Sequence, residues 1–330
     1  MSSFTTRLTR LWGIDKPIVS APMAGRAGGE LARAVSLAGG LGTFGVSASA
    51  SPEWITEQAA IARQGGVYGI GLMLWAMEKN PELGEQQWKA VLDARPSVVS
   101  LGFGDSTRYV EEAHDHGISV VQPVNTIAQL RTALAAEADA ITVQGTDAGG
   151  HTGRLGTTPW MQIALDYMEI HAPAIPVAVA GGIGSGRGVA SVLAAGADAA
   201  WVGTAFLASP ECLGGEELQK ASVNARSTDA VLTDIYDIAE QQAWDTETWP
   251  TRTIRNSFVD AYAELRERGE VSDDELIAAR APGGDYADEL KLHAGQGVSL
   301  LRSRMPAGKV VDMLHDDAMH FLERMRTRLG

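Results

Sequence analysis

Cysteine is nearly absent from this sequence of 330 residues, in which Cys212 is the single thiol. One thiol cannot form an intramolecular disulfide framework and cannot supply a thiolate zinc site. We therefore expect no disulfides and no metal site, which fits a reducing compartment.

Long apolar runs are also missing. No stretch of about 18 or more uncharged apolar residues suggests a membrane span, and the first 20 residues lack the apolar core of a secretory signal. We therefore expect a cytoplasmic protein without a membrane partner.

Positive charge is scarce, because 27 Lys and Arg face 41 Asp and Glu, giving a net charge of −14 at pH 7. Nucleic-acid binding requires clustered Lys and Arg that release counterions, and no basic stripe is visible. A nucleic-acid partner is therefore not expected. Any anion that binds must be held by local groups, such as the backbone N–H groups at the start of a helix.

What the sequence does contain is a repeating rhythm. Short apolar runs recur at intervals of roughly 20 to 30 residues with helical patterns between them, as in βαβ units with a parallel sheet. The expected strands are Pro17–Ala21, Gly42–Val46, Tyr68–Met73, Val98–Gly102, Ser119–Pro123, Ala140–Gln144, Val177–Ala180 and Ala200–Gly203.

Between these strands lie seven expected helices: Glu30–Ala38, Pro52–Arg63, Glu85–Asp93, Thr107–His114, Thr126–Ala136, Pro159–Glu169 and Gly186–Ala195. Eight strands with intervening helices in about 210 residues favour a closed (β/α)₈ TIM barrel over an open doubly wound sheet. The fold class is therefore α/β.

The pattern breaks after Pro210. We expect the barrel over residues 1–212 and a smaller inserted helical domain over residues 213–293, which would serve as a substrate or lid domain. Residues 294–330 would return to the barrel with its last helix, Pro306–Arg328. The alternative is a run of extra helices packed around the barrel without a function in the cleft.

A glycine-rich turn joins the seventh expected strand to the next helix, with Gly181, Gly182 and Gly184 in the turn. Glycines let the backbone approach a ligand, and the N–H groups at a helix start favour a phosphate. One strand later, Gly203 and Thr204 form a second small pair. Barrel enzymes often hold a phosphate between these two loops, so we expect a phosphate here. The alternative is that these glycines serve only to make tight turns and bind no phosphate.

His151 follows Gly149 and Gly150 just after the sixth expected strand. A histidine at that end of a barrel strand lies on the catalytic face and can exchange protons near neutral pH, so we expect His151 to be catalytic. The other six histidines lie on helical or surface-like segments, where a structural role is the simpler expectation.

Taken together, several motifs resemble the nitronate monooxygenase family over nearly the whole chain. They are Ala21-Pro-Met-Ala-Gly25, the stretch Gln144–Gly153, Ala180-Gly-Gly-Ile183, Val202-Gly-Thr204, Arg255-Asn256 and Ala294-Gly-Gln-Gly-Val298. The resemblance implies an FMN-dependent oxidoreductase whose flavin lies across the barrel mouth, and it implies that His151 matches the family's catalytic residue. It further implies FMN contacts from Met23, Gln144, Gly149, Gly182, Gly203 and Thr204, to which the phosphate loop adds Gly181.

Two positions depart from the family pattern. Where the family usually has an asparagine near the flavin on strand three, this chain has Gly71. We expect Gly71 to lie beside the cofactor, but without the side-chain contact that asparagine would make. Where the family usually has glutamate before the Ala-Gly-Gly-His run, this chain has Asp147, whose carboxylate reaches less far.

The function implied is oxidation of a small alkyl nitronate with dioxygen, giving a carbonyl compound and nitrite. One alternative left open is an NAD(P)H-dependent flavin reductase acting on a quinone or an enoyl thioester, because the same barrel supports several reactions. Another is a non-enzymatic flavin- or phosphate-binding regulator. The expected partners are a small-molecule substrate and dioxygen, and the sequence leaves a homodimer open.

Overall fold

The computed structural model describes residues 4–329. Eight parallel strands form one sheet in the order β1-β9-β8-β6-β5-β4-β3-β2, and a bridge between Val19 and Leu41 joins its two ends into a barrel. The strands are β1 (Ile18–Ser20), β2 (Gly42–Gly45), β3 (Tyr68–Met73), β4 (Val98–Gly102), β5 (Ser119–Val124), β6 (Ala140–Gln144), β8 (Val177–Ala180) and β9 (Ala199–Val202). The expected (β/α)₈ barrel is confirmed.

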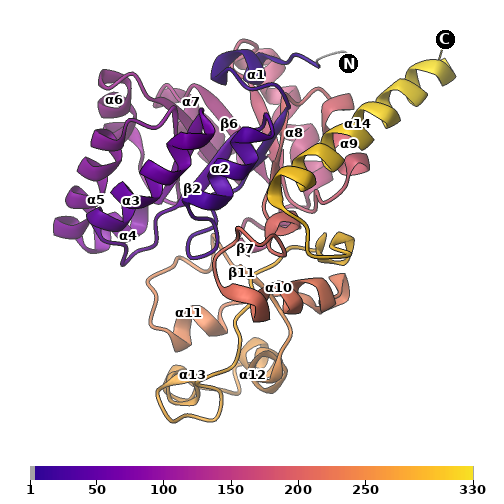
Figure 1. Ribbon diagram of the computed structural model, residues 1–330. Helices are drawn as coiled ribbons and strands as arrows, with labels where there is room; N and C mark the ends of the chain where they lie inside the picture. The colour runs from indigo at the N-terminus through magenta and orange to yellow at the C-terminus, as the bar shows by residue number, and fades with distance from the viewer. Residues whose placement is uncertain (1–3, 330) are drawn as a thin grey trace.

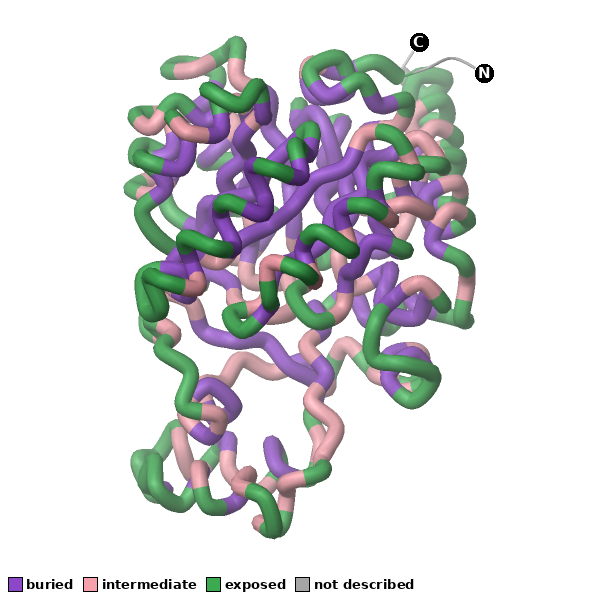
Figure 2. Tube along the Cα trace, turned by 60° about the vertical axis from the view of Figure 1, so that its left-hand side comes forward, coloured by how far each residue is buried: buried purple, intermediate pink, exposed green. Residues whose placement is uncertain are grey.

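Helices surround the barrel, and Figure 2 shows the buried strands enclosed by helices whose outer faces are exposed. The helices that lie between strands are α2 (Gly29–Leu37), α3 (Pro52–Ala62), α4 (Leu74–Lys79), α5 (Pro81–Ala94), α6 (Thr107–Asp115), α7 (Ile127–Ala135), α8 (Thr157–His171) and α9 (Gly186–Ala194). The last helix is α14 (Ala307–Leu329), which packs beside α9. Outward-facing strand residues such as Ile141 and Val179 meet these helices in the core, because side chains alternate along a strand.

One end of the barrel is closed by an N-terminal helix that the sequence analysis did not anticipate. Leu8 and Trp12 of α1 (Arg7–Trp12) are buried against Val19, Val98 and other inward-facing residues near the strand starts. Active sites of such barrels lie at the opposite end, where the strands finish. Helix α1 therefore leaves only the carboxyl end of the barrel open to a ligand.

The segment between β9 and α14 forms a separate lobe at that carboxyl end, at the bottom of Figure 1. It contains four helices, α10 (Gly215–Asn224), α11 (Ile235–Ala239), α12 (Ser257–Arg268) and α13 (Asp273–Arg280). It also contains two strands that were not expected, β10 (Ala230–Thr233) and β11 (Thr251–Ile254). With β7 (Gly150–His151) from the loop after β6, they make an antiparallel sheet in the order β10-β11-β7. This small sheet ties the lobe to the segment that carries His151.

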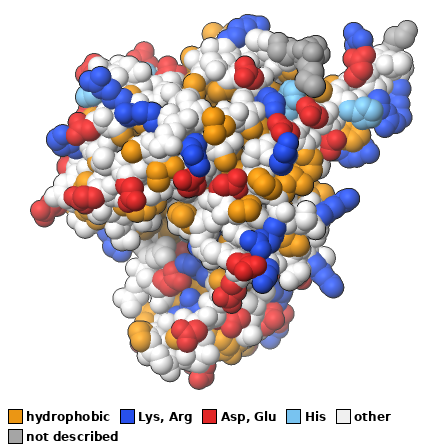
Figure 3. Space-filling model, in the orientation of Figure 1, with side chains coloured by type: hydrophobic (Ala, Val, Ile, Leu, Met, Phe, Trp, Pro, Cys, Tyr) orange, Lys and Arg blue, Asp and Glu red, His pale blue; other side chains and the backbone are white. Residues whose placement is uncertain are grey.

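On the face drawn in Figure 3, acidic and basic side chains are interspersed over both the barrel and the lobe. Within residues 4–329, none of the helices combines the length and the apolar character that crossing a membrane requires.

Candidate active site

The glycine loop after β8 lies at the carboxyl end of the barrel. Gly181 and Gly182 have φ angles of +115° and +69°, a backbone conformation that favours glycine. Helix α9 then begins at Gly186, with Ser185 as its N-cap and the Ser185 hydroxyl accepting from the Gly188 N–H. Gly181 and Gly182 line a cavity of about 450 Å³.

Helix α8 contributes Thr157 to the same cavity. The Thr157 Oγ1 atom itself is buried against the backbone of Gly145 and Gly181 and has no hydrogen-bond partner among the described residues. Asp147 also lines the cavity, and one of its carboxylate oxygens accepts from the Thr157 backbone N–H at 2.9 Å.

The five glycines expected beside a cofactor fall into two groups. Three are explained by packing within the protein, because an added Cβ would lie 2.4 Å from the Pro22 ring at Gly71, 2.5 Å from backbone atoms of Ala294 and Gly295 at Gly149, and 2.4 Å from Thr157 Oγ1 at Gly181.

The other two glycines have more room. The nearest atom to an added Cβ is 3.2 Å away at Gly182 and 3.4 Å away at Gly203, and both of these nearest atoms belong to side chains. The protein's own packing therefore does not account for the missing side chain at Gly203, and at Gly182 only the positive φ demands glycine. A close approach by a ligand would explain both.

The remaining expected contacts surround these loops. The Met23 Sδ atom lies against Gly203, and the Thr204 hydroxyl accepts from the Gly295 N–H at 3.0 Å. The Gln144 amide donates to the His151 carbonyl at 3.2 Å and accepts from the buried Asn125 amide at 3.1 Å. Asn125 was not anticipated. It lies just after β5 and provides an amide near the strand ends, although residue 71 has none.

His151 lies on β7, at the junction of barrel and lobe. Register pairs it with Thr251 of β11. Its Nε2 atom is 3.1 Å from Asp237 Oδ1 and 2.7 Å from Thr251 Oγ1, and the Thr251 hydroxyl donates to the other Asp237 oxygen at 2.6 Å. The Nδ1 atom makes no hydrogen bond to a described residue. The His151 side chain is only 11% exposed, and that of Asp237 only 4%.

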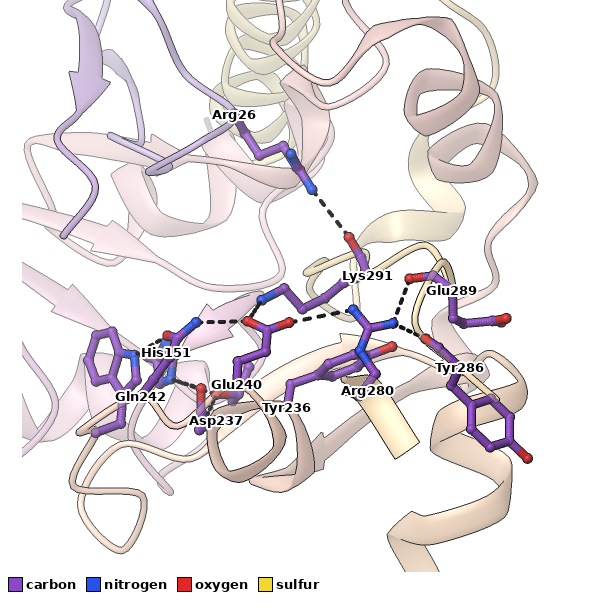
Figure 4. Close-up of polar contacts among 12 residues, drawn as sticks. Arg26, His151, Tyr236, Asp237, Glu240, Gln242, Arg280, Tyr286, Glu289 and Lys291 are labelled. Carbon is purple, nitrogen blue, oxygen red and sulfur yellow. Dashed lines mark hydrogen bonds and ion pairs between the residues drawn. The ribbon is translucent and has the colours of Figure 1, made fainter. Parts of the chain in front are cut away.

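The groups around His151 have opposing effects on its pKa. Burial lowers the pKa of His151 most, while the hydrogen bond and the charge of Asp237 raise this pKa and the ammonium of Lys291 lowers it. Lys291 is itself paired with Glu240, as Figure 4 shows beside the contact between His151 and Asp237. Because burial is the largest effect, the imidazole is biased towards its neutral form, which suits a base near neutral pH.

An aromatic cluster covers this histidine. The Trp244 indole stacks on the His151 ring at 3.4 Å between centroids, with 12° between the planes. Trp75 follows β3 and Phe103 follows β4. Their ring centroids lie 4.9 and 5.0 Å from the centroid of the Trp244 ring. One face of the His151 ring is therefore covered by an aromatic cluster that combines residues of the barrel with Trp244 of the lobe.

The sequence analysis missed Asp237, Thr251 and Trp244, since all three lie in the segment expected to be helical. Asp237 is 86 residues from His151 along the chain. The one local signal was the presence of aromatic residues, which are commonly buried, in an otherwise acidic segment. This signal did not indicate which aromatic residue would face His151.

A second cavity, of about 550 Å³, lies within the lobe away from His151. Its walls include Arg252, Arg255 and residues of β10 and α12. Arg252 is buried and donates to the Thr146 and Ala230 carbonyls at 2.8 and 2.9 Å, so its structural role is to fasten β11 to the loop after β6.

Comparison with protein families gives a match to the nitronate monooxygenase model over residues 71–317. A nitronate monooxygenase from Paraburkholderia phytofirmans is 29% identical, covering 97% of this chain and 96% of that protein. One from Pseudomonas aeruginosa is 30% identical, covering 69% of this chain and 76% of that protein.

Two solved structures are similar over almost their full length. FabK from Thermotoga maritima has a TM-score of 0.80 and 27% identity, covering 98% of this chain and 99% of that one. A nitroalkane oxidase from Streptomyces ansochromogenes has a TM-score of 0.77 and 27% identity, covering 98% and 100%.

Proposed function

Since the chain belongs to the nitronate monooxygenase family, a family of flavoprotein oxidoreductases, we propose that it oxidises a small alkyl nitronate with FMN and dioxygen to a carbonyl compound and nitrite. The observation that carries this proposal is the arrangement at the carboxyl end of the barrel. There, a buried, neutral-biased histidine and a glycine-lined cavity come from different loops. Proton transfer and cofactor anchoring are thus separate tasks of separate residues.

The residues fit an FMN phosphate. Gly182 and Gly203 leave room for a ligand close to the backbone. Helix α9 adds the favourable dipole of its N-terminus. We assign the phosphate to these groups and place Met23, Gln144 and Thr204 beside the rest of the flavin. No dinucleotide fingerprint offers a site for the adenosine half of FAD.

Bound FMN would supply the redox chemistry, in which electrons pass from the nitronate to dioxygen. The protein's part is to bind, orient and exclude water. His151 either takes the carbon proton of a neutral nitroalkane or hydrogen-bonds to the oxygens of a preformed nitronate. The lobe over residues 213–293 acts as the lid and substrate domain, because Trp244 and Asp237 of this lobe contact His151 directly.

The test is His151→Asn, assayed by nitrite release with a neutral nitroalkane and with its preformed nitronate. The variant should keep its flavin. With the nitroalkane it should lose ~10²- to 10⁴-fold in rate, as expected for removal of a general base. With the nitronate the loss should be smaller, because no proton has to be removed. Unchanged rates on both substrates would exclude a chemical role for His151.

A second candidate is an NAD(P)H-dependent flavin reductase acting on a quinone or an enoyl thioester. It is favoured by the similarity to FabK and by a relative from Rhodococcus jostii named as a carboxyl-CoA dehydrogenase, which is 29% identical over 64% of this chain. Rapid loss of flavin colour on anaerobic mixing with NADH would support this candidate.

A further inference from the structure

The hydrogen bonds around His151 define where its proton lies. Three side-chain groups meet there: His151 Nε2, the Thr251 hydroxyl and the Asp237 carboxylate. Nε2 lies 3.1 Å from the carboxylate and 2.7 Å from the hydroxyl, and the hydroxyl lies 2.6 Å from the carboxylate. All three side chains are largely buried. Pairing of β7 with β11 fixes Thr251 opposite His151, and Asp237 comes from helix α11 of the lobe.

The proton count follows from the chemistry of these groups. A carboxylate only accepts hydrogen bonds, and a hydroxyl has a single proton to donate. The contact between Thr251 and Asp237 therefore uses the hydroxyl proton. Only lone pairs of Thr251 Oγ1 remain for His151, so Nε2 must carry a hydrogen. A neutral imidazole has one N–H, which leaves Nδ1 with a free lone pair.

We propose that Asp237 and Thr251 are positioning residues that hold the proton of neutral His151 on Nε2 and leave Nδ1 as the atom that accepts the substrate's proton. This inference rests on the proposed function. In the step, the carbon–hydrogen bond of a neutral nitroalkane breaks and an Nδ1–H bond forms. The electron pair left on carbon moves into the nitro group and gives the nitronate. Asp237 then faces the imidazolium and stabilises its charge, by the logic of other histidine bases oriented by a carboxylate.

The charged and titratable groups around this unit agree with that role. From the lobe, Asp237 faces the ring directly, and Glu240 pairs with Lys291 and so reduces the effect of its ammonium. The His293 ring lies 6.4 Å from the His151 ring, and burial lowers the pKa of His293 well below its usual value. Asp237 is thus the one charge in direct contact with the His151 ring among the described residues.

Because Asp237 and Thr251 belong to the lobe, the lobe does more than cover the site. Thr251 lies on β11 and Asp237 on α11, so a motion that separates the lobe from β7 would remove both partners of Nε2 at once. The base is therefore complete only when the lobe is seated on the barrel.

The experiment uses the flavin-loaded enzyme with ¹⁵N-labelled histidine, and reads the His151 ring nitrogens by long-range ¹H–¹⁵N spectra. Assignment comes from the loss of its signals in His151→Asn. Above the pH at which His151 titrates, the wild type should show a protonated Nε2 and an unprotonated Nδ1. Asp237→Asn and Thr251→Val should each shift this towards a mixture of the two tautomers. Thr251→Ser keeps the hydroxyl and should restore the wild-type pattern.

Kinetics supply the second readout. Asp237→Asn should move the acidic limb of kcat/KM for the nitroalkane to lower pH and reduce kcat at least about tenfold, with little effect on the preformed nitronate. Thr253→Val is the matched control, because Thr253 is also buried on β11 but donates to the Leu292 carbonyl and does not contact His151. It should leave the tautomer and the pH profile unchanged even if it lowers stability.

Two outcomes overturn the inference: a protonated Nδ1 in the neutral wild-type ring, or wild-type spectra and pH profiles in both Asp237→Asn and Thr251→Val. Neither outcome touches the proposed function, which is lost only if no nitronate is turned over.

Discussion

Gly203→Ala separates ligand binding from protein stability more cleanly than any other change in the site. Gly203 has a φ angle of −110°, which alanine can adopt, and its added Cβ would meet Ala21 Cβ and Met23 Sδ at 3.4 Å, an ordinary contact distance. The protein alone should therefore accept the methyl group. Its unfolding free energy should stay the same or rise by up to about 1 kcal/mol, because alanine restricts the unfolded chain.

The methyl group would nevertheless stand where we propose that the flavin approaches the backbone. We expect FMN affinity to fall at least about tenfold, which corresponds to ~1.4 kcal/mol of binding free energy. Fluorescence titration of the flavin-free protein with FMN measures the affinity, and urea unfolding without flavin measures the stability. An alanine variant with wild-type affinity would refute the placement of the cofactor beside Gly203. A variant that unfolds more easily would refute the packing argument.

Three further predictions follow from named contacts. Gly182 and Gly117 both have a φ of +69°, so alanine at either position should cost ~1–2 kcal/mol of stability from backbone strain, and at Gly182 the added Cβ would also lie 3.2 Å from Asp147 Cβ. Only Gly182→Ala should lose FMN affinity, and equal FMN titrations of the two variants would show that the phosphate is elsewhere. Burial raises the pKa of the Cys212 thiol to about 11, so alkylation at pH 8 should be slow until urea unfolds the chain, and rapid labelling of the folded protein would contradict the buried position. Burial lowers the pKa of His293 below its unfolded value of about 6.5, so the unfolded state binds the extra proton and stability should fall as the pH drops below ~6.5, by up to ~1.4 kcal/mol per pH unit. His293→Gln should flatten that slope in urea unfolding at a series of pH values, and an unchanged slope would assign the acid sensitivity to other groups.

The barrel could be predicted from the sequence because each of its strands is a buried apolar run. Val98–Gly102 and Val177–Ala180, for example, have the bounds that were expected. Such strands are buried on both sides, so their composition alone identifies them. The position of His151 at the carboxyl end of the barrel could also be predicted, because it follows β6 closely along the chain.

The lobe could not be predicted in the same way. Strand β11 reads Thr-Arg-Thr-Ile and so forms no apolar run, while three of the four residues of β10 are only partly buried. Strand β11 also pairs with β7, which lies about a hundred residues earlier in the chain, as the contact of Thr251 with His151 shows. Contacts over such separations leave no local pattern in a single sequence. Composition likewise does not show that Gly71 and Gly149 are required by Pro22 and by the backbone of Gly295.

In the function that we propose, a nitronate and not a nicotinamide delivers electrons to FMN. The most direct measurement uses two separate anaerobic experiments, in which the flavin-loaded enzyme is mixed with propyl-2-nitronate in one and with NADH in the other. Both follow the visible absorbance of the oxidised flavin. We predict rapid loss of that absorbance with the nitronate, its return with nitrite release when dioxygen is admitted, and only slow loss with NADH. Rapid loss with NADH, together with no change in the presence of nitronate, would contradict the account and identify a flavin reductase.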